Sequence, residues 1–390
     1  MGVFSFFKSR VTWLHGFVKT IIWKNLHLLR IQGPPKLFWY FYRLARPVHK
    51  ELIVKNSVHG SSNFSRKLHN EIEPIHRTYL SIPEKVFYQN REVEYDFAWA
   101  ISNSIPRAEH VTYVRNIVDE GASEKMIREA SNACRSGEKS LLILWGIPLG
   151  QESSTVRKLH ELHKLGERSR SIVFLGDVRK TRGLGQIVDY VDKVDLVIHF
   201  NPLVLKNELG SFAGKTMIWP GIPYPEDKME VLRFRQKRPV LSISGQSYRY
   251  RSIYINYCEK RGIPILDTSS RGATYPISSF WKYLDFVSSA QIMFANGYLY
   301  PRESILVGKV IEAILTGTTV LYESGSWINR FLVPFEHFIP VYNKFDLIEK
   351  AQYLLENPEV AETIARNAYS FYTTHYSSRD FWSKVQKKLA

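Results

Sequence analysis

Hydrophobic and polar residues follow two alternating periods along most of the chain, as is typical of helices and strands in succession. Between residues 307 and 322, apolar residues recur at helical spacing and then give way to an almost uncharged stretch rich in β-branched side chains. This pattern predicts a helix with one buried face, which ends near Gly317 and leads into a strand covered on both sides. The alternation of strand-like and helix-like segments begins at about residue 94. We therefore expect an α/β protein built from βαβ units with mainly parallel sheets.

The same periodicity predicts strands in both halves of the chain. In the first half they are residues 110–114, 140–145, 171–176, 196–201 and 216–219, and in the second half 239–244, 264–268, 291–294, 319–322 and 338–341. Helices are predicted at 124–135 and 154–165, the clearest of the first half, and at 277–289, 307–315, 344–357 and 359–376.

Breaks in the pattern divide the chain into four parts. Gly and Pro at 221–225, followed by a highly charged stretch, place a joint at about 221–238. We expect an N-terminal extension and linker (1–93), a first Rossmann-like domain (94–225), a second (226–345) and closing helices that cross back to the first (346–390). Residues 51–93 are polar and weakly patterned, and we interpret them as a linker or irregular subdomain. Two such domains would hold a ligand in a cleft at the carboxyl ends of both sheets.

The N-terminal extension combines an apolar stripe with positive charge. Six apolar residues recur at steps of three and four, as on one face of a helix: Phe4, Phe7, Val11, Leu14, Val18 and Ile21. The net charge of the chain is +16, and residues 1–60 hold ten Lys or Arg against the single acid Glu51. Basic residues interrupt the stripe, so neither a signal peptide nor a membrane span of about 20 residues is predicted. Two hypotheses remain open: residues 1–50 bind an anionic membrane surface, or the stripe packs on protein.

Composition narrows the class of protein further. The chain has 390 residues, of which 44% are hydrophobic, enough for two cores. Cys134 and Cys258 are the only cysteines and lack the spacing of metal ligands. The absence of a disulfide framework suits a reducing compartment. We therefore expect the protein to be cytoplasmic, with peripheral attachment to a membrane as an option.

The segment GKVIEAILTGTTVLYES resembles the donor-site helix and the following strand of the GT-B glycosyltransferases. In that pattern a basic residue precedes Glu-Ala, and a small residue, Gly and a buried strand follow. The resemblance continues through residues 329–367 and is closest to the spore-maturation-protein-like branch of the "glycosyl transferases group 1" families. It implies two Rossmann-like domains facing a cleft, with a nucleotide-sugar donor bound to the second.

The resemblance also implies donor-binding residues in the second half. Lys309 would bind the diphosphate at a helix N-terminus, and Glu312 would accept hydrogen bonds from ribose hydroxyls. Gly245 and Arg251, with Arg249 as a further candidate, follow the predicted strand 239–244 and would also contact the diphosphate. Without the resemblance, these residues would be interpreted as a solvated Lys–Glu pair and a basic surface turn.

The loop before the donor helix contributes two further candidates. Arg302 could bind phosphate and Glu303 a sugar hydroxyl, and the alternative is a surface ion pair. Glu303 departs from the family register, since the commoner retaining families place a glutamate eight positions before the one at Glu312, where this chain has Ser304.

Two residues of the first half are candidates for acceptor-side catalysis. Asp177 ends a predicted strand at the place where the family has Asp, so it could contact the acceptor or abstract its proton. His199 lies in the next strand and is the second candidate for a catalytic base. The alternative is that His199 has only a structural role. We find no metal-ligand cluster, so no cofactor and no metal is expected, and metal-independent sugar transfer is predicted.

Together these features predict a glycosyltransferase that moves a sugar from a nucleotide-sugar to a hydroxyl acceptor, such as a lipid-linked or cell-envelope glycan. Two alternatives remain: a nucleotide-sugar-modifying enzyme on the same fold, and a non-catalytic basic protein that binds membrane or nucleic acid. Nucleic acid is the less expected partner, because the excess of basic residues lies on a predicted amphipathic helix and not in a recognised nucleic-acid-binding motif.

Overall fold

The structure is a computed structural model of the chain. It describes residues 77–83, 85–88, 91–94, 96–105, 110–114, 120–145, 169–175, 191–200, 214–245, 249–267, 279–300, 303–304, 306–323 and 327–390. The chain separates into compact units at residues 1–58 and 59–390, and all described residues belong to the second. The predicted N-terminal helix and the predicted helix at 154–165 lie outside the described residues.

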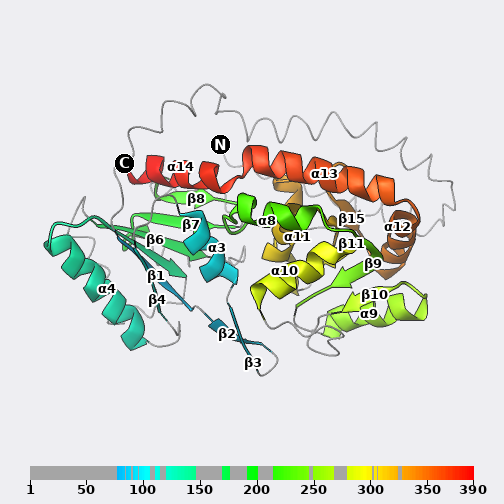
Figure 1. Cartoon of the computed structure of the whole chain (residues 1–390), viewed down its shortest axis with the longest axis horizontal. Helices are drawn as coiled ribbons and strands as arrows, with labels where there is room; N and C mark the ends of the chain where they lie inside the picture. Colours follow the sequence, from blue (N-terminus) through cyan, green and yellow to red (C-terminus); the bar gives the residue numbers. More distant parts are fainter. Residues whose placement is uncertain are drawn as a thin grey trace, which may run out of the picture. The chain divides into compact units, whose positions relative to one another are not determined.

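Two parallel sheets with helices around them form the described part of the chain (Figure 1). The first sheet has the strand order β4-β1-β5-β6-β7-β8, and all of its neighbouring strands are parallel. Its strands are β1 (Arg77–Pro83), β4 (His110–Val114), β5 (Ser140–Trp145), β6 (Ser169–Leu175), β7 (Leu196–His199) and β8 (Thr216–Ile218). Helices α3 (Asp96–Ser104) and α4 (Glu120–Arg135) belong to this half. The predicted fold class, α/β with two mainly parallel sheets, is confirmed.

The interpretation of residues 51–93 as a linker or irregular subdomain is wrong for β1. This strand lies inside the first sheet and pairs in parallel with both β4 and β5. The pattern concealed it because a polar residue, Thr78, occupies a buried strand position with no exposed surface. A short antiparallel pair, β2 (Lys85–Tyr88) and β3 (Arg91–Glu94), follows it and was not predicted either.

The second sheet has the order β10-β9-β11-β14-β15, again parallel throughout. Its strands are β9 (Arg238–Ile243), β10 (Ile265–Asp267), β11 (Ala290–Ala295), β14 (Thr319–Glu323) and β15 (Ile339–Val341), each within two residues of its predicted bounds. The helices of this half are α8 (Glu226–Arg233), α9 (Arg249–Lys260), α10 (Phe280–Ser289), α11 (Gly308–Leu315), α12 (Lys344–Glu356) and α13 (Pro358–His375), and a short pair of strands, β12 (Tyr298–Tyr300) and β13 (Glu303–Ser304), precedes α11.

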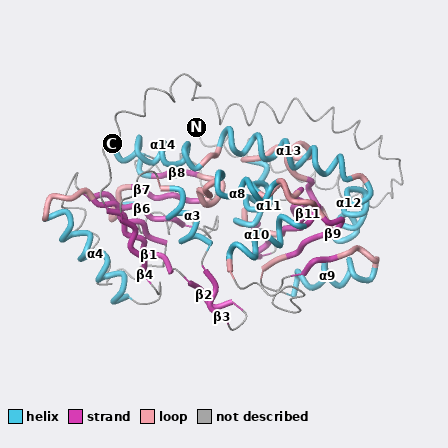
Figure 2. The backbone as a smooth tube through the Cα atoms, viewed as in Figure 1, coloured by secondary structure: helices cyan, strands magenta, loops and turns pink. Residues whose placement is uncertain are grey.

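Side chains of the second sheet alternate between two cores. On β11, Ile292 and Phe294 pack into the core that also contains residues of α9 and α12, whereas Met293 and Ala295 pack into the core with α10 and α11. Helices therefore cover both faces of this sheet (Figure 2). This explains why its strands read as nearly continuous hydrophobic runs instead of alternating ones.

The last helix, α14 (Ser378–Leu389), packs on the first sheet although α13 packs on the second. Phe381 stacks on Phe174 of β6 with ring centroids 5.7 Å apart, and Trp382 Nε1 donates to Ser104 Oγ at 3.1 Å. Glu226, at the start of α8, accepts hydrogen bonds from the backbone N–H and the hydroxyl of Ser378. The C-terminal helices thus contact both sheets.

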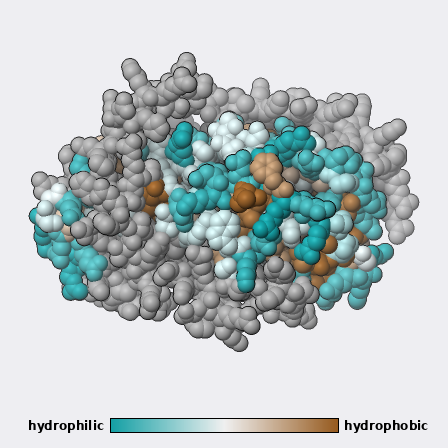
Figure 3. Space-filling view, in the orientation of Figure 1, coloured by the Kyte–Doolittle hydropathy of each residue, from teal (hydrophilic) through white to brown (hydrophobic). Residues whose placement is uncertain are grey.

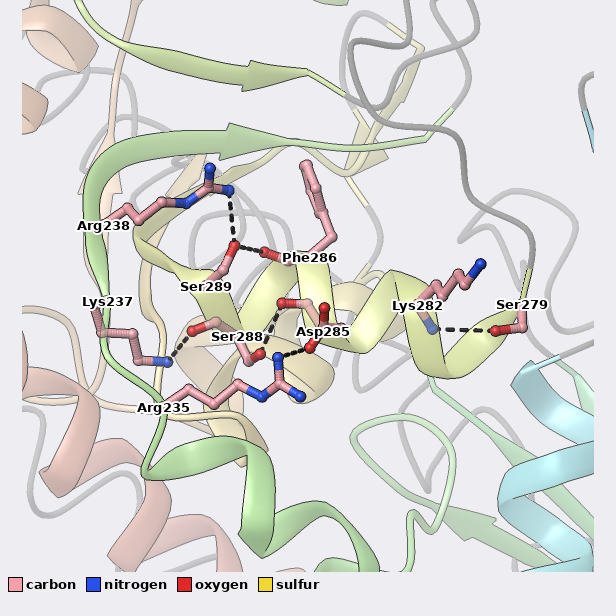
Figure 4. A network of polar contacts seen from close by, with 9 residues as sticks. All are labelled: Arg235, Lys237, Arg238, Ser279, Lys282, Asp285, Phe286, Ser288 and Ser289. Carbon is pink, nitrogen blue, oxygen red and sulfur yellow. Dashed lines mark hydrogen bonds and ion pairs between the residues drawn. The ribbon is translucent and has the colours of Figure 1, made fainter.

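The segment between α8 and β9 is fastened to the C-terminal ends of two helices. Lys237 Nζ donates to the carbonyl oxygens of Ser288 and Thr316, at 2.7 Å in each case. Arg235 forms an ion pair with Asp285 on α10 (Figure 4). An ammonium at a helix C-terminus satisfies carbonyls that have no partner within the helix and interacts favourably with the helix dipole. Lys237 therefore ties the ends of α10 and α11 together.

On the face seen in Figure 3, the described residues are mostly hydrophilic, and the hydrophobic ones form small separate spots. Of the large apolar side chains that the structure describes, the most exposed are Phe234 and Val231, three positions apart at the end of α8, at 73% and 68% exposure. Exposed apolar residues in such small numbers are normal on a folded protein. Among the described residues, no helix has the length and apolar character needed to cross a membrane.

Candidate functional site

The strand order of the second sheet identifies one place where a ligand site is expected. From β9 the chain passes through α9 to β10 on one side, and then crosses back through α10 to β11 on the other side. In open α/β sheets, ligands bind outside the carboxyl ends of the strands where the order reverses. Here that place lies beyond the ends of β9 and β11, where Ser244, Gly245 and Asn296 follow the two strands.

Two cationic side chains from different helices meet beside Gly245. Its backbone has a φ of +100°, a conformation that glycine adopts without strain. A Cβ added to this glycine would lie 2.8 Å from Lys309 Nζ and 3.0 Å from Arg251 Nη1. The absence of a side chain at residue 245 therefore lets the Lys309 ammonium and the Arg251 guanidinium approach the backbone together.

The position of Lys309 follows from the packing of α11. Val310, Ile311 and Ile314 are fully buried and hold this helix on the sheet. Lys309, near the N-terminus of the helix, reaches the end of β9, where its Nζ donates to the carbonyl oxygen of Ser244 at 2.7 Å. Val307 precedes the helix and provides no side-chain cap for its first N–H groups. The helix N-terminus therefore adds partial positive charge beside the two cations.

The electrostatics of this group favour an anion. Burial and, to a smaller extent, the neighbouring Arg251 charge lower the pKa of Lys309 to about 7, against the opposing effect of Glu312. Two like charges that are held side by side in a partly desolvated position repel each other. A diphosphate placed against both would remove that repulsion and restore the charged form of the lysine.

Arg251 is fixed from its other side by Asn296. The Oδ1 atom of Asn296 accepts from Arg251 Nε at 3.1 Å and from Nη2 at 3.0 Å. Both side chains are at least nine-tenths buried. These two bonds orient the guanidinium so that Nη1 is the nitrogen that faces Gly245. Asn296 thus sets the direction in which Arg251 presents its charge.

Glu312, one turn after Lys309, is a buried carboxylate with only 2% exposure. Its Oε1 accepts a hydrogen bond from the hydroxyl of Tyr224 at 2.5 Å. The same oxygen lies close to the start of α11, since a Cβ added at Gly308 would be 3.6 Å from it. A buried carboxylate in such a position can accept hydrogen bonds from ligand hydroxyls.

The structure thus brings together four of the seven predicted donor-binding residues: Gly245, Arg251, Lys309 and Glu312. Arg249 is the first residue of α9 and Glu303 the first of β13, but their side chains lie outside the described part, as does all of Arg302. The roles of all seven in donor binding stay predictions.

Of the two catalytic candidates, Asp177 lies outside the described residues. His199 ends β7 in the first sheet, and its side chain has no exposed surface. A catalytic base must come within hydrogen-bonding reach of its substrate. The catalytic role of His199 stays a prediction beside the structural alternative.

The sequence did not single out Asn296 or Tyr224 as site residues. The sequence could have indicated Asn296 as a site residue, because it follows a predicted strand at the same sheet edge as Gly245. Tyr224 lies in the joint between the two halves, where no local pattern relates it to residue 312. Among the described residues, no group of three or more His, Cys, Asp or Glu side chains could hold a metal ion.

Comparison with known proteins agrees with this geometry. Residues 275–386, which contain Lys309 and Glu312, match a family described as "Glycosyl transferase-like". No curated protein matches the chain in sequence. Among solved structures, an alpha-glucosyltransferase in complex with UDP and a 13-mer DNA containing an A:G mismatch is similar with a TM-score of 0.53 at 11% identity, over 82% of this chain and 100% of that one. An alpha-glucosyltransferase in complex with UDP-glucose and DNA containing an abasic site has a TM-score of 0.50 at 12% identity, over 80% and 90% of the two chains.

The paired parallel sheets and the cationic site define the class: the chain has the GT-B fold. Its C-terminal part is glycosyltransferase-like in sequence, as the resemblance of the donor helix implied. The narrower assignment to the spore-maturation-protein-like branch stays a prediction.

Proposed function

We propose that this chain transfers a sugar from a nucleotide-sugar donor to a hydroxyl acceptor. The observation that carries the proposal is the convergence of Gly245, Arg251, Lys309 and Glu312. These residues come from three separate segments and meet at the strand-order reversal of the second sheet. The GT-B fold and the family match of residues 275–386 support the same reaction class.

In this reaction the bond between the anomeric carbon and the diphosphate oxygen breaks, and the diphosphate leaves with the electron pair. The acceptor oxygen bonds to the anomeric carbon and gives up its proton. Lys309, Arg251 and the N-terminus of α11 would stabilise the charge that develops on the leaving diphosphate. Glu312 would hold the ribose hydroxyls, and Asp177 is the proposed acceptor-side base.

We further propose that stabilising the charge of the leaving diphosphate needs no metal ion. The side chains of Lys309 and Arg251 and the N-terminus of α11 already supply positive charge beside Gly245. UDP is the first nucleotide to test, since the two similar structures hold UDP or UDP-glucose.

Calorimetric titration of UDP tests the donor site. We expect the wild type to bind UDP equally well with and without EDTA, and Glu312→Ala to bind it about 10- to 100-fold more weakly, because a hydrogen bond to a charged group is lost. Glu356→Ala, an exposed glutamate on α12, is the matched control and should bind as the wild type does. If the wild type binds none of UDP, GDP, ADP, CDP and dTDP, the proposed function is wrong.

For the acceptor, we propose a lipid-linked or cell-envelope glycan that the chain meets at a membrane surface. The basis is the sequence of residues 1–50, where Lys and Arg flank an apolar helical stripe. A full-length variant with Lys8, Lys19 and Lys24 changed to Glu should lose sedimentation with phosphatidylglycerol vesicles at low salt, whereas the wild type should retain it. The same charge change at three exposed lysines, Lys260, Lys282 and Lys387, is the control. Equal vesicle binding by wild type and N-terminal variant would exclude this role of the segment.

A further inference from the structure

Tyr224 lies in the connection between the two halves, after β8 and just before α8. Its side chain has no exposed surface, and its hydroxyl donates to Glu312 Oε1 at 2.5 Å. Tyr224 and Glu312 are 88 positions apart in the chain. The contact therefore joins the connecting segment to the donor helix at the carboxylate proposed to bind ribose.

The ring of Tyr224 is held firmly enough to fix that hydroxyl. It stacks on Phe280 of α10, with ring centroids 6.2 Å apart and an interplanar angle of 15°. Phe280 in turn contacts Trp99 of α3, at a centroid distance of 5.2 Å. A row of aromatic rings thus runs from the first half to Glu312. Aromatic side chains lose little conformational entropy when they are fixed, and they keep a polar group in one place.

The backbone on both sides of the contact is also close. A Cβ added to Gly308 would lie 3.4 Å from the Tyr224 hydroxyl, and one added to Gly221 would lie 3.4 Å from Ile311 Cγ1. The connecting segment is therefore packed against the first turns of α11 over several residues. The Tyr224 hydroxyl has little room to move away from Glu312.

A carboxylate at the end of a glutamate side chain can rotate about several torsions, and it recognises a ribose only when its oxygens point at the hydroxyls. A short hydrogen bond from a rigid phenol removes that freedom by holding one oxygen. A site built in this way discriminates strongly against ligands that lack the matching hydroxyl, because its polar group is then left unpaired.

From these contacts we propose that Tyr224 is a positioning residue that orients Glu312 toward the ribose, and that it thereby selects ribonucleotide over deoxyribonucleotide donors. The inference rests on the proposed function, since it takes the ribose-binding role of Glu312 as given. Tyr224 acts through Glu312 and does not itself contact the reacting atoms.

The test compares UDP with 2′-deoxy-UDP and 3′-deoxy-UDP by calorimetry. We expect the wild type to prefer UDP by about tenfold over at least one of the two analogues, and Tyr224→Phe to reduce that preference to less than about threefold. The affinity for the disfavoured analogue should stay nearly unchanged. Tyr372→Phe is the matched control: Tyr372 is also fully buried, and its hydroxyl has no hydrogen-bond partner among the described residues.

A second comparison separates positioning from a general effect on packing. In the Glu312→Ala background, Tyr224→Phe should have no further effect on the preference, because the group it positions is absent. A Tyr224→Phe protein that keeps the full wild-type preference would overturn the inference, as would a wild type that binds UDP and both analogues equally. A wild type that binds no UDP would instead count against the proposed function.

Discussion

Lys309→Met is expected to weaken binding of UDP-glucose about 30- to 100-fold at pH 6.5, the loss typical of one charge-assisted hydrogen bond to phosphate. The substitution keeps an unbranched side chain and removes only the ammonium. It also relieves the repulsion from Arg251, so the free energy of unfolding should not fall substantially. The defect should therefore appear in binding and not in folding.

The pH dependence of binding gives the sharper readout. The pKa of Lys309 is about 7 in the ligand-free protein, and a bound diphosphate favours the charged form and raises it. Above pH 7 the side chain of Lys309 is mostly a neutral amine, which must gain a proton on binding, so wild-type affinity should fall about tenfold between pH 7 and pH 8.5. A nucleotide-sugar is the better ligand for this measurement, because it lacks the terminal phosphate of UDP that titrates in the same range.

In Lys309→Met the affinity should be low and nearly independent of pH across this interval. Lys282→Met, at an exposed position on α10, should keep both the wild-type affinity and its pH profile. Isothermal titration calorimetry at pH 6.5, 7.5 and 8.5 measures both quantities. If the Lys309→Met protein shows the same decline with pH as the wild type, another group is responsible and Lys309 does not bind the diphosphate.

Gly245→Ala should weaken donor binding by at least about 30-fold while leaving the protein folded. The new methyl group would stand within 3.0 Å of Lys309 Nζ and Arg251 Nη1, and both atoms are side-chain ends, which shift at lower cost than backbone atoms. Folding therefore loses only about 1 to 2 kcal/mol from the positive φ. Binding loses more, because the atoms that move are the ones proposed to contact the diphosphate.

Gly137→Ala is the matched control for this substitution. Gly137 has a φ of +95°, close to the +100° of Gly245, but nothing lies within 4 Å of a Cβ added there. Both variants should lose similar stability in thermal melts, and only Gly245→Ala should lose affinity for UDP. Equal affinity in the two variants would show that the space beside Gly245 is not needed for the donor.

Much of the second half could be predicted because its local patterns agree with its final environment. The helical period of residues 307–315 predicted α11, and the uncharged β-branched run after it predicted β14. Positions that follow strands, such as Gly245, could be assigned to one sheet edge because parallel strands all end on the same side. The structure then placed Lys309 and Arg251 beside that glycine.

The features that could not be predicted depend on contacts between distant segments. β1 was missed because a polar residue, Thr78, fills a buried position there, so composition suggested a linker. Tyr224 and Glu312 are joined by packing of the interdomain segment on α11, and no spacing in the sequence encodes that contact. The buried environment of His199 likewise arises from the neighbouring strands, which its own strand pattern does not reveal.

The position of α14 also has a consequence for the order in which the chain is made. Phe381 packs on Phe174, which is synthesised about 210 residues earlier, and Trp382 bonds to Ser104, which is 278 positions earlier in the chain. During translation the first half therefore emerges with part of its hydrophobic surface uncovered, and it remains so until α14 has been synthesised. Contacts of such long sequence separation form slowly because a large loop must close first. We therefore expect the first half to be prone to aggregation until α14 has been synthesised.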